Sequence, residues 1–141
     1  MLKGIPKILS PELLKVLMEM GHGDELVIAD GNFPAGALAR RLVRADGHGT
    51  VELLDAILRF FPLDQYDPNP VVLMQVVPGD KVETPIWDEY RAVVTKYYPE
   101  ASEFKHVERF AFYERAKQAY AVVATGEAAL YANLILKKGV V

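Results

Sequence analysis

A single histidine between two glycines, in the stretch Gly21-His22-Gly23-Asp24, is the feature of this sequence that most directly indicates chemistry. Histidine has an unperturbed pKa of about 6.5, so its imidazole can give and take a proton near neutral pH. The flanking glycines leave room for a ligand or a backbone segment beside the ring. A carboxylate, Asp30, follows after one short apolar run. The stretch therefore predicts general acid–base chemistry at His22.

Two other interpretations of His22 stay open at this point. Gly21 follows a segment with helical spacing, as a residue just beyond a helix end does, and an imidazole there would be favoured by the helix dipole. A metal site using His22, Asp24, Asp30 and His48 would have suitable ligand types, but their spacing is not diagnostic. We expect no bound metal.

A second group of polar side chains lies near the end of the chain, where Tyr131 and Asn133 follow the turn at Thr125-Gly126. In an extended segment the two side chains would point to the same side. A phenol hydroxyl and a carboxamide offer donors and acceptors that suit a polyhydroxylated ligand. The structural alternative is a tyrosine in the core and an asparagine in a turn.

Composition narrows the class of function. The net charge is −3, and no Lys/Arg stripe interleaved with aromatic residues occurs, which argues against nucleic acid as a partner. No apolar run approaches the ~20 residues of a membrane span, and no cysteine is present, which predicts a cytoplasmic protein without disulfides or thiolate metal sites. The pair Gly21 and Gly23 precedes an apolar run and does not follow one, so it is not a dinucleotide-binding fingerprint. We expect no cofactor.

The elements that must position these residues follow from apolar periodicity and turn signals. Helices are predicted over residues 11–20, 33–42, 50–61 with Thr50 as the cap, 85–97 and 110–118. Strands are predicted over residues 25–29, 71–77, 104–107, 120–124 and 132–136. This alternation predicts an α/β fold: a single layered domain, residues 1–141, with a mixed, partly parallel sheet of about five strands flanked by helices. Asp30 then lies at the carboxyl end of a strand, where open α/β sheets bind ligands.

Together these blocks resemble the L-fucose mutarotase and D-ribose pyranase family. The resemblance covers nearly the whole chain, and four blocks carry it in order: Gly21-His22-Gly23-Asp24, Ile28-Ala29-Asp30, the run from Arg109 to Arg115, and Tyr131-Ala132-Asn133 with residues 136–140. The block that begins at Arg109 resembles the fucose branch. Asn32 departs from some fucose-branch members, which have a histidine there, and this leaves the fine sugar preference open.

The resemblance implies a cofactor-free interconversion of the α and β anomers of a monosaccharide, L-fucose in the fucose branch. It implies that His22 is the proton-donating catalytic residue and that Asp30, Arg109, Tyr131 and Asn133 contact the sugar. It also implies ring-shaped homo-oligomers, commonly decamers, in which the pocket is completed near a subunit boundary.

We hypothesise that His22 exchanges the proton of the ring oxygen, that Tyr131 or a water acts at the anomeric hydroxyl, and that Asp30 and Arg109 fix neighbouring hydroxyls. Asp30 could instead orient the imidazole and set its tautomer. Three alternative functions stay open: a D-ribose pyranase, a noncatalytic sugar-binding protein associated with transport, and a metal-dependent hydrolase.

Overall fold

Helices and strands alternate along the chain in the computed structural model, which describes residues 1–141. The α-helices are α1 (Pro11–Glu19), α2 (Ala35–Leu38), α3 (Thr50–Leu58), α4 (Ile86–Tyr97) and α5 (Arg109–Gln118). The strands are β1 (Glu25–Ala29), β2 (Leu42–Ala45), β3 (Val71–Met74), β4 (Lys105–Val107), β5 (Ala121–Thr125) and β6 (Leu134–Lys137). A short 3₁₀ turn, Pro99–Ala101, follows α4.

One sheet contains every strand, in the order β2-β5-β1-β6-β3-β4. Strands β2, β5 and β1 are parallel, as are β3 and β4, whereas β6 runs antiparallel to both of its neighbours, β1 and β3. Five strands therefore end at the same edge of the sheet, where β6 begins. We name this the carboxyl edge, and we name the opposite edge, where those five strands start, the amino edge.

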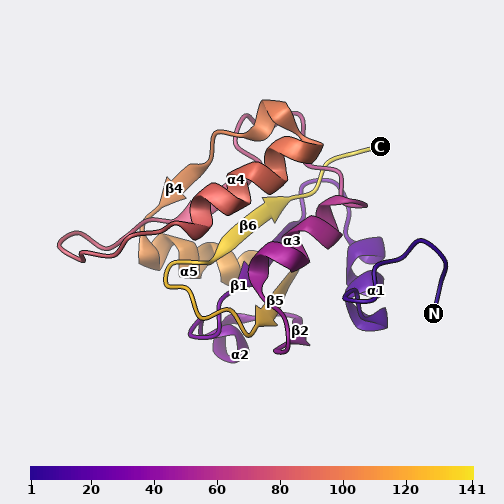
Figure 1. Cartoon of the computed structure of the whole chain (residues 1–141), viewed down its shortest axis with the longest axis horizontal. Helices are drawn as coiled ribbons and strands as arrows, with labels where there is room; N and C mark the ends of the chain where they lie inside the picture. Colours follow the sequence, from indigo (N-terminus) through magenta and orange to yellow (C-terminus); the bar gives the residue numbers. More distant parts are fainter.

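Helices cover both faces of the sheet (Figure 1). The larger core packs α1, α3 and α4 against one face, and the smaller core packs α2 and α5 against the other. In β1, Leu26 and Ile28 belong to the larger core and Val27 belongs to the smaller one. Its apolar residues are almost continuous because both sides of the strand are buried.

The predicted α/β class is confirmed, but the sheet has six strands and not about five. Residues 33–42 do not form one helix: α2 ends at Leu38, and the unpredicted strand β2 begins at Leu42. This edge strand lacks a strong apolar pattern and takes its conformation from pairing with β5. Thr50 is the first helical residue of α3 and not its cap, a position that Gly49 occupies. No helix has the length and apolar character needed to cross a membrane.

Gly126 joins the end of β5 to the segment that leads to Tyr131. Its N–H donates to the carbonyl of His48 at 3.0 Å. A Cβ at this position would overlap the backbone carbonyl oxygen of Asp46, and a backbone atom cannot rotate away as a side chain can. The absence of a side chain therefore allows the turns after β2 and β5 to pack together.

We expect Gly126→Ala to lower the free energy of unfolding by about 1–3 kcal/mol, the usual range for overpacking. Chemical denaturation of the purified variant measures this change. Gly36→Ala is the matched control, because no atom lies within 4 Å of a Cβ built at that helical glycine. An equal loss in both variants would contradict the steric explanation.

Candidate active site

Asp30 lies directly after β1 at the carboxyl edge and is buried, with 5% of its surface exposed. Its carboxylate accepts hydrogen bonds from the backbone N–H of Asn32 at 3.0 Å and of Ala132 at 3.3 Å. The side chain of Asn133 donates to the same carboxylate at 3.0 Å, while its carbonyl oxygen accepts from the backbone N–H of Asp30 at 2.8 Å. This reciprocal pair ties the end of β1 to the start of β6.

Burial raises the pKa of Asp30 above its ordinary value of 3.8, and the three hydrogen bonds to the carboxylate oppose that shift. The group has no cationic partner among its hydrogen bonds. The side chain of Asn133 forms two hydrogen bonds with Asp30 and thereby orders its carboxylate. Asn133 also lines the cavity next to Asp30.

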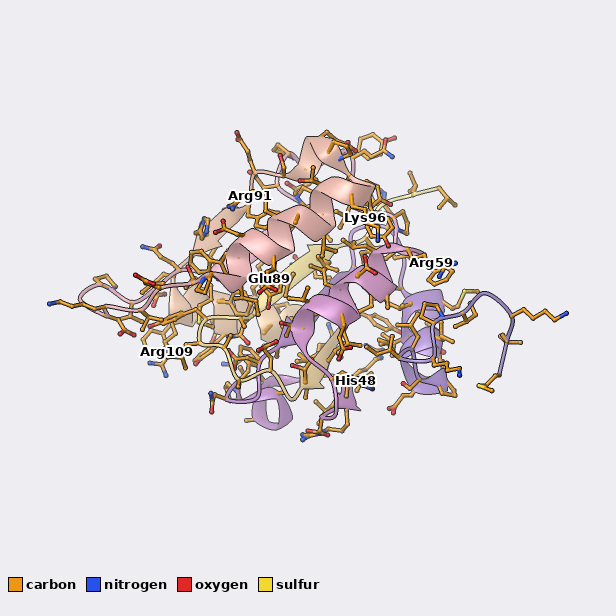
Figure 2. The ribbon with its side chains drawn as sticks, in the orientation of Figure 1. His48, Arg59, Glu89, Arg91, Lys96 and Arg109 are labelled. Carbon is orange, nitrogen blue, oxygen red and sulfur yellow. The ribbon has the colours of Figure 1, made fainter.

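Arg109 is the first residue of α5, and its side chain is exposed at the carboxyl edge. Its Nε donates to the hydroxyl of Tyr113, one helical turn later, at 3.1 Å. Figure 2 shows Arg109 at the end of the molecule from which the loop between β3 and α4 protrudes. The remaining guanidinium N–H groups are available to donate to an oxygen-rich ligand.

Tyr131 adopts a left-handed backbone conformation, with φ 55°. Its hydroxyl donates to Asp80 at 2.6 Å and accepts from the backbone N–H of Val77 at 3.3 Å. The bond to the Asp80 carboxylate raises the pKa of Tyr131, so the phenol is protonated at neutral pH and serves as a hydrogen-bond donor. Residue 131 therefore lies in a turn, so the extended geometry that would place Tyr131 and Asn133 on the same side does not occur. Asn133 is buried and Tyr131 is partly exposed.

One cavity of about 290 Å³ brings four of the five predicted residues together. This volume lies near the lower end of the range for small-ligand pockets. The predicted residues at the cavity are Asp30, Arg109, Tyr131 and Asn133. A larger hollow of about 840 Å³ lies between α3 and α4, but it contains none of the predicted residues. The smaller cavity is the better candidate for a sugar, because carboxylate, guanidinium and phenol groups converge on it.

His22 lies elsewhere, at the amino edge, between α1 and β1. The five residues of β1 separate it from Asp30, and a strand of that length spans about 16 Å. The Nε2 of His22 is 3.1 Å from a carboxylate oxygen of Asp64, and 45% of the imidazole side chain is exposed. Asp64, and not Asp30, therefore orients the imidazole within one chain.

The geometry bears on two other interpretations of His22, as a cation at the end of α1 and as a metal ligand. At the C-terminus of α1, the ammonium of Lys138 donates to the carbonyls of Leu17 and Met20, so Lys138 supplies the cation there. His22 and Asp30 lie at opposite edges and form no joint metal site within the chain. No group of three or more His, Asp or Glu side chains is arranged to hold a metal ion.

Comparisons with known proteins agree on one family. A sequence model of the RbsD / FucU transport protein family matches residues 3–141. An L-fucose mutarotase from Actinobacillus pleuropneumoniae is 53% identical over 140 residues, which cover 99% of this chain and 97% of that protein. The chain belongs to the RbsD / FucU transport protein family.

Solved structures of the RbsD / FucU family share the fold. The crystal structure of FucU from Bifidobacterium longum is 60% identical, with a TM-score of 0.96 and 99% of each chain covered. The fucose mutarotase from Streptococcus pneumoniae, in complex with L-fucose, is 52% identical, with a TM-score of 0.95 and 99% of each chain covered. Bacillus subtilis RbsD complexed with D-ribose is 23% identical, with a TM-score of 0.73 and about 95% of each chain covered, and shows the shared fold alone.

Sequence reasoning missed three residues that form hydrogen bonds with the predicted site residues. Asp64 contacts His22, Tyr113 accepts from Arg109, and Asp80 accepts from Tyr131. The spacing of four residues on one helix could have indicated the Arg109 and Tyr113 pair. The other two pairs join residues far apart in the sequence, and no local signal marks them.

We expect the carboxyl carbon of Asp30 to titrate in NMR above the ordinary value of 3.8, because burial disfavours its charge. Asp46 is the internal reference with the opposite sign: its hydrogen bond from Arg44 lowers its pKa. Since folding raises the pKa of Asp30, its contribution to stability is fully present below 3.8 and is lost as the pH rises through the folded value. Titration of Asp30 below Asp46 would contradict this assignment.

Proposed function

We propose that this protein interconverts the α and β anomers of L-fucose without a cofactor. The observation that carries the proposal is a sugar-sized cavity lined by Asp30, Arg109 and Tyr131, in a chain 52% identical to a fucose mutarotase whose structure holds L-fucose. Curated relatives that bear the name L-fucose mutarotase match over nearly their full length.

The reaction needs proton transfers and no redox step. A pyranose opens when its ring oxygen gains a proton and the anomeric hydroxyl loses one, and rotation of the exposed aldehyde followed by ring closure gives the other anomer. Positioned acid–base groups typically contribute 10²–10⁴-fold to a rate. That is sufficient for a reaction that already proceeds in water.

The residues of the carboxyl edge bind and orient the sugar in this proposal. Asp30 accepts from a sugar hydroxyl, because its ordered carboxylate retains lone pairs after its three hydrogen bonds. Arg109 donates to a neighbouring oxygen. The phenol oxygen of Tyr131 accepts the proton of the anomeric hydroxyl as the phenol passes its own proton to Asp80, and both transfers reverse when the ring closes.

His22 reaches the sugar from a second copy of the chain. A contact that joins the carboxyl edge of one copy to the amino edge of the next brings this half-exposed imidazole to the neighbour's cavity. Exposed apolar side chains flank both parts: Met18, Phe60 and Val140 near His22, and Phe110 and Leu130 near the cavity. Such a heterologous contact repeats from copy to copy and forms a ring when the rotation between neighbours closes, in line with the ring-shaped homo-oligomer that the family resemblance implies.

The decameric state and the cytoplasmic location of the protein stay predictions. The roles of the site residues also stay predictions, for His22, Asp30, Arg109, Tyr131 and Asn133. A D-ribose pyranase and a noncatalytic sugar-binding protein are the outcomes against which the proposal is tested.

Saturation-transfer NMR on L-fucose and on D-ribose, with a chelator present, tests the reaction and its substrate together. We expect faster exchange between the anomers of L-fucose at catalytic protein concentrations, and a smaller effect on D-ribose. Faster exchange for D-ribose alone would replace the proposal by a pyranase. Absence of both, with sugar binding retained, would leave a binding protein.

We expect His22→Ala to reduce anomer exchange by about 10²–10⁴-fold, the contribution of a positioned general acid. His48→Ala is a matched control, because its imidazole is 42% exposed and also lies near a carboxylate, Glu52, at 3.3 Å. Equal activity of the two variants would contradict the catalytic role of His22.

Mixed oligomers test whether the site is shared between copies. His22→Ala and Arg109→Ala chains, coexpressed with different affinity tags, should be inactive alone and regain about a quarter of the wild-type rate when mixed, since one contact in four then joins an intact His22 to an intact Arg109. The His22 side chain is 45% exposed and Arg109 is exposed, so neither change should unfold the chain. A mixture as inactive as its parts would place the complete site within one chain.

A further inference from the structure

The backbone at Tyr131 needs outside support. Tyr131 is the only residue other than glycine with a positive φ. A side chain with a Cβ is disfavoured in the left-handed region, so such a residue persists where its surroundings fix it. The direction of the phenol ring depends on this backbone conformation, because the ring projects from the turn.

Two donors on α4 hold the carbonyls of this turn. The indole Nε1–H of Trp87 donates to the carbonyl of Tyr131 at 2.8 Å, and the hydroxyl of Tyr90 donates to the carbonyl of Ala132 at 2.8 Å. Trp87 and Tyr90 are three residues apart, so they lie on the same face of the helix. Tyr90 is fully buried and Trp87 is half-buried.

The donor at Tyr90 is itself fixed. Its hydroxyl lies 2.5 Å from the hydroxyl of Thr50, which also contacts the carboxylate of Glu127 at 3.2 Å. The hydroxyl of Tyr90 donates its single proton to the carbonyl of Ala132. Burial raises the pKa of Tyr90 above its ordinary value of 10.0, so the phenol keeps this proton at neutral pH.

The loop that precedes α4 contacts the hydroxyl of Tyr131. The loop of residues 75–85 leads directly into α4 and protrudes from the molecule (Figure 1). Asp80 and Val77, which bond the Tyr131 hydroxyl, belong to this loop. The segment of residues 75–90 therefore fixes both the backbone and the phenol of Tyr131. Glu89, in contrast, lies on the exposed surface of α4 (Figure 2).

We propose that Trp87 and Tyr90 are positioning residues for anomer exchange: they hold the Tyr131 turn in its left-handed form, so that the phenol stands at the sugar site before the sugar arrives. This inference rests on the proposed function. Neither residue lines the cavity, so both act through Tyr131 and not on the sugar.

The first test needs no catalysis. In protein labelled with ¹³C-tyrosine, Trp87→Phe removes the indole donor and keeps an aromatic ring, and it should shift the ring resonances of Tyr131. Tyr97→Phe is the control on the same helix, because its hydroxyl donates instead to Asp55 at 3.0 Å. Unmoved Tyr131 resonances in Trp87→Phe would overturn the proposal, whether or not the protein acts on L-fucose.

The second test is a kinetic cycle on L-fucose. We expect Trp87→Phe and Tyr90→Phe each to lower kcat by about fivefold with little change in KM, the effect of losing one net hydrogen bond. Tyr97→Phe should keep the wild-type kcat. In a Tyr131→Phe background, Trp87→Phe should change kcat by less than about twofold, because the phenol that it positions is gone.

The outcomes separate the two proposals. Wild-type protein without anomer exchange would refute the proposed function, while the NMR arm still decides whether α4 sets Tyr131. Normal exchange in the wild type, with Trp87→Phe and Tyr90→Phe equally active, would overturn the positioning role. An undiminished effect of Trp87→Phe in the Tyr131→Phe background would do the same, because a general loss of stability does not depend on the Tyr131 hydroxyl.

Discussion

The reciprocal hydrogen bonds between Asp30 and Asn133 are the constraint on which the carboxyl edge depends. An ionised carboxylate loses its hydration when it is buried, and without replacement donors that loss would neutralise it or destabilise the fold. The amide of Asn133 and the backbone N–H groups of Asn32 and Ala132 replace the water. They can do so because β6 is the one antiparallel strand: it begins at the edge where β1 ends.

Much of the sheet could be predicted from the sequence, since burial on both faces gives a continuous apolar run. The strand at residues 25–29 was predicted with its true bounds, and β5 lies within one residue of its prediction at each end. The edge strand β2 could not be predicted, because its exposed Arg44 breaks the pattern and its conformation comes from β5, which is distant in sequence. Local patterns do not contain that information.

For the site, the sequence allowed one physical deduction: a polar residue that follows a buried parallel strand belongs at a ligand-binding edge, and Asp30 lies there. The residues that tune the site could not be found in the same way. Asp64 meets His22 across 42 positions of sequence, and Asp80 meets Tyr131 across 51. The left-handed turn at Tyr131 was also hidden, because no glycine marks it and its support comes from side chains on α4.

The separation of His22 from Asp30 by the length of β1 has a consequence for the geometry of any assembly in which neighbouring chains share a site. If each interface between neighbours makes one complete site, an open row of chains always leaves an unused imidazole at one terminus and an unused cavity at the other. A closed ring has as many interfaces as chains, so every imidazole and every cavity belongs to a complete site. A substitution at either edge of one subunit would then inactivate a site that it shares with a neighbour, although the neighbour's part of that site is intact.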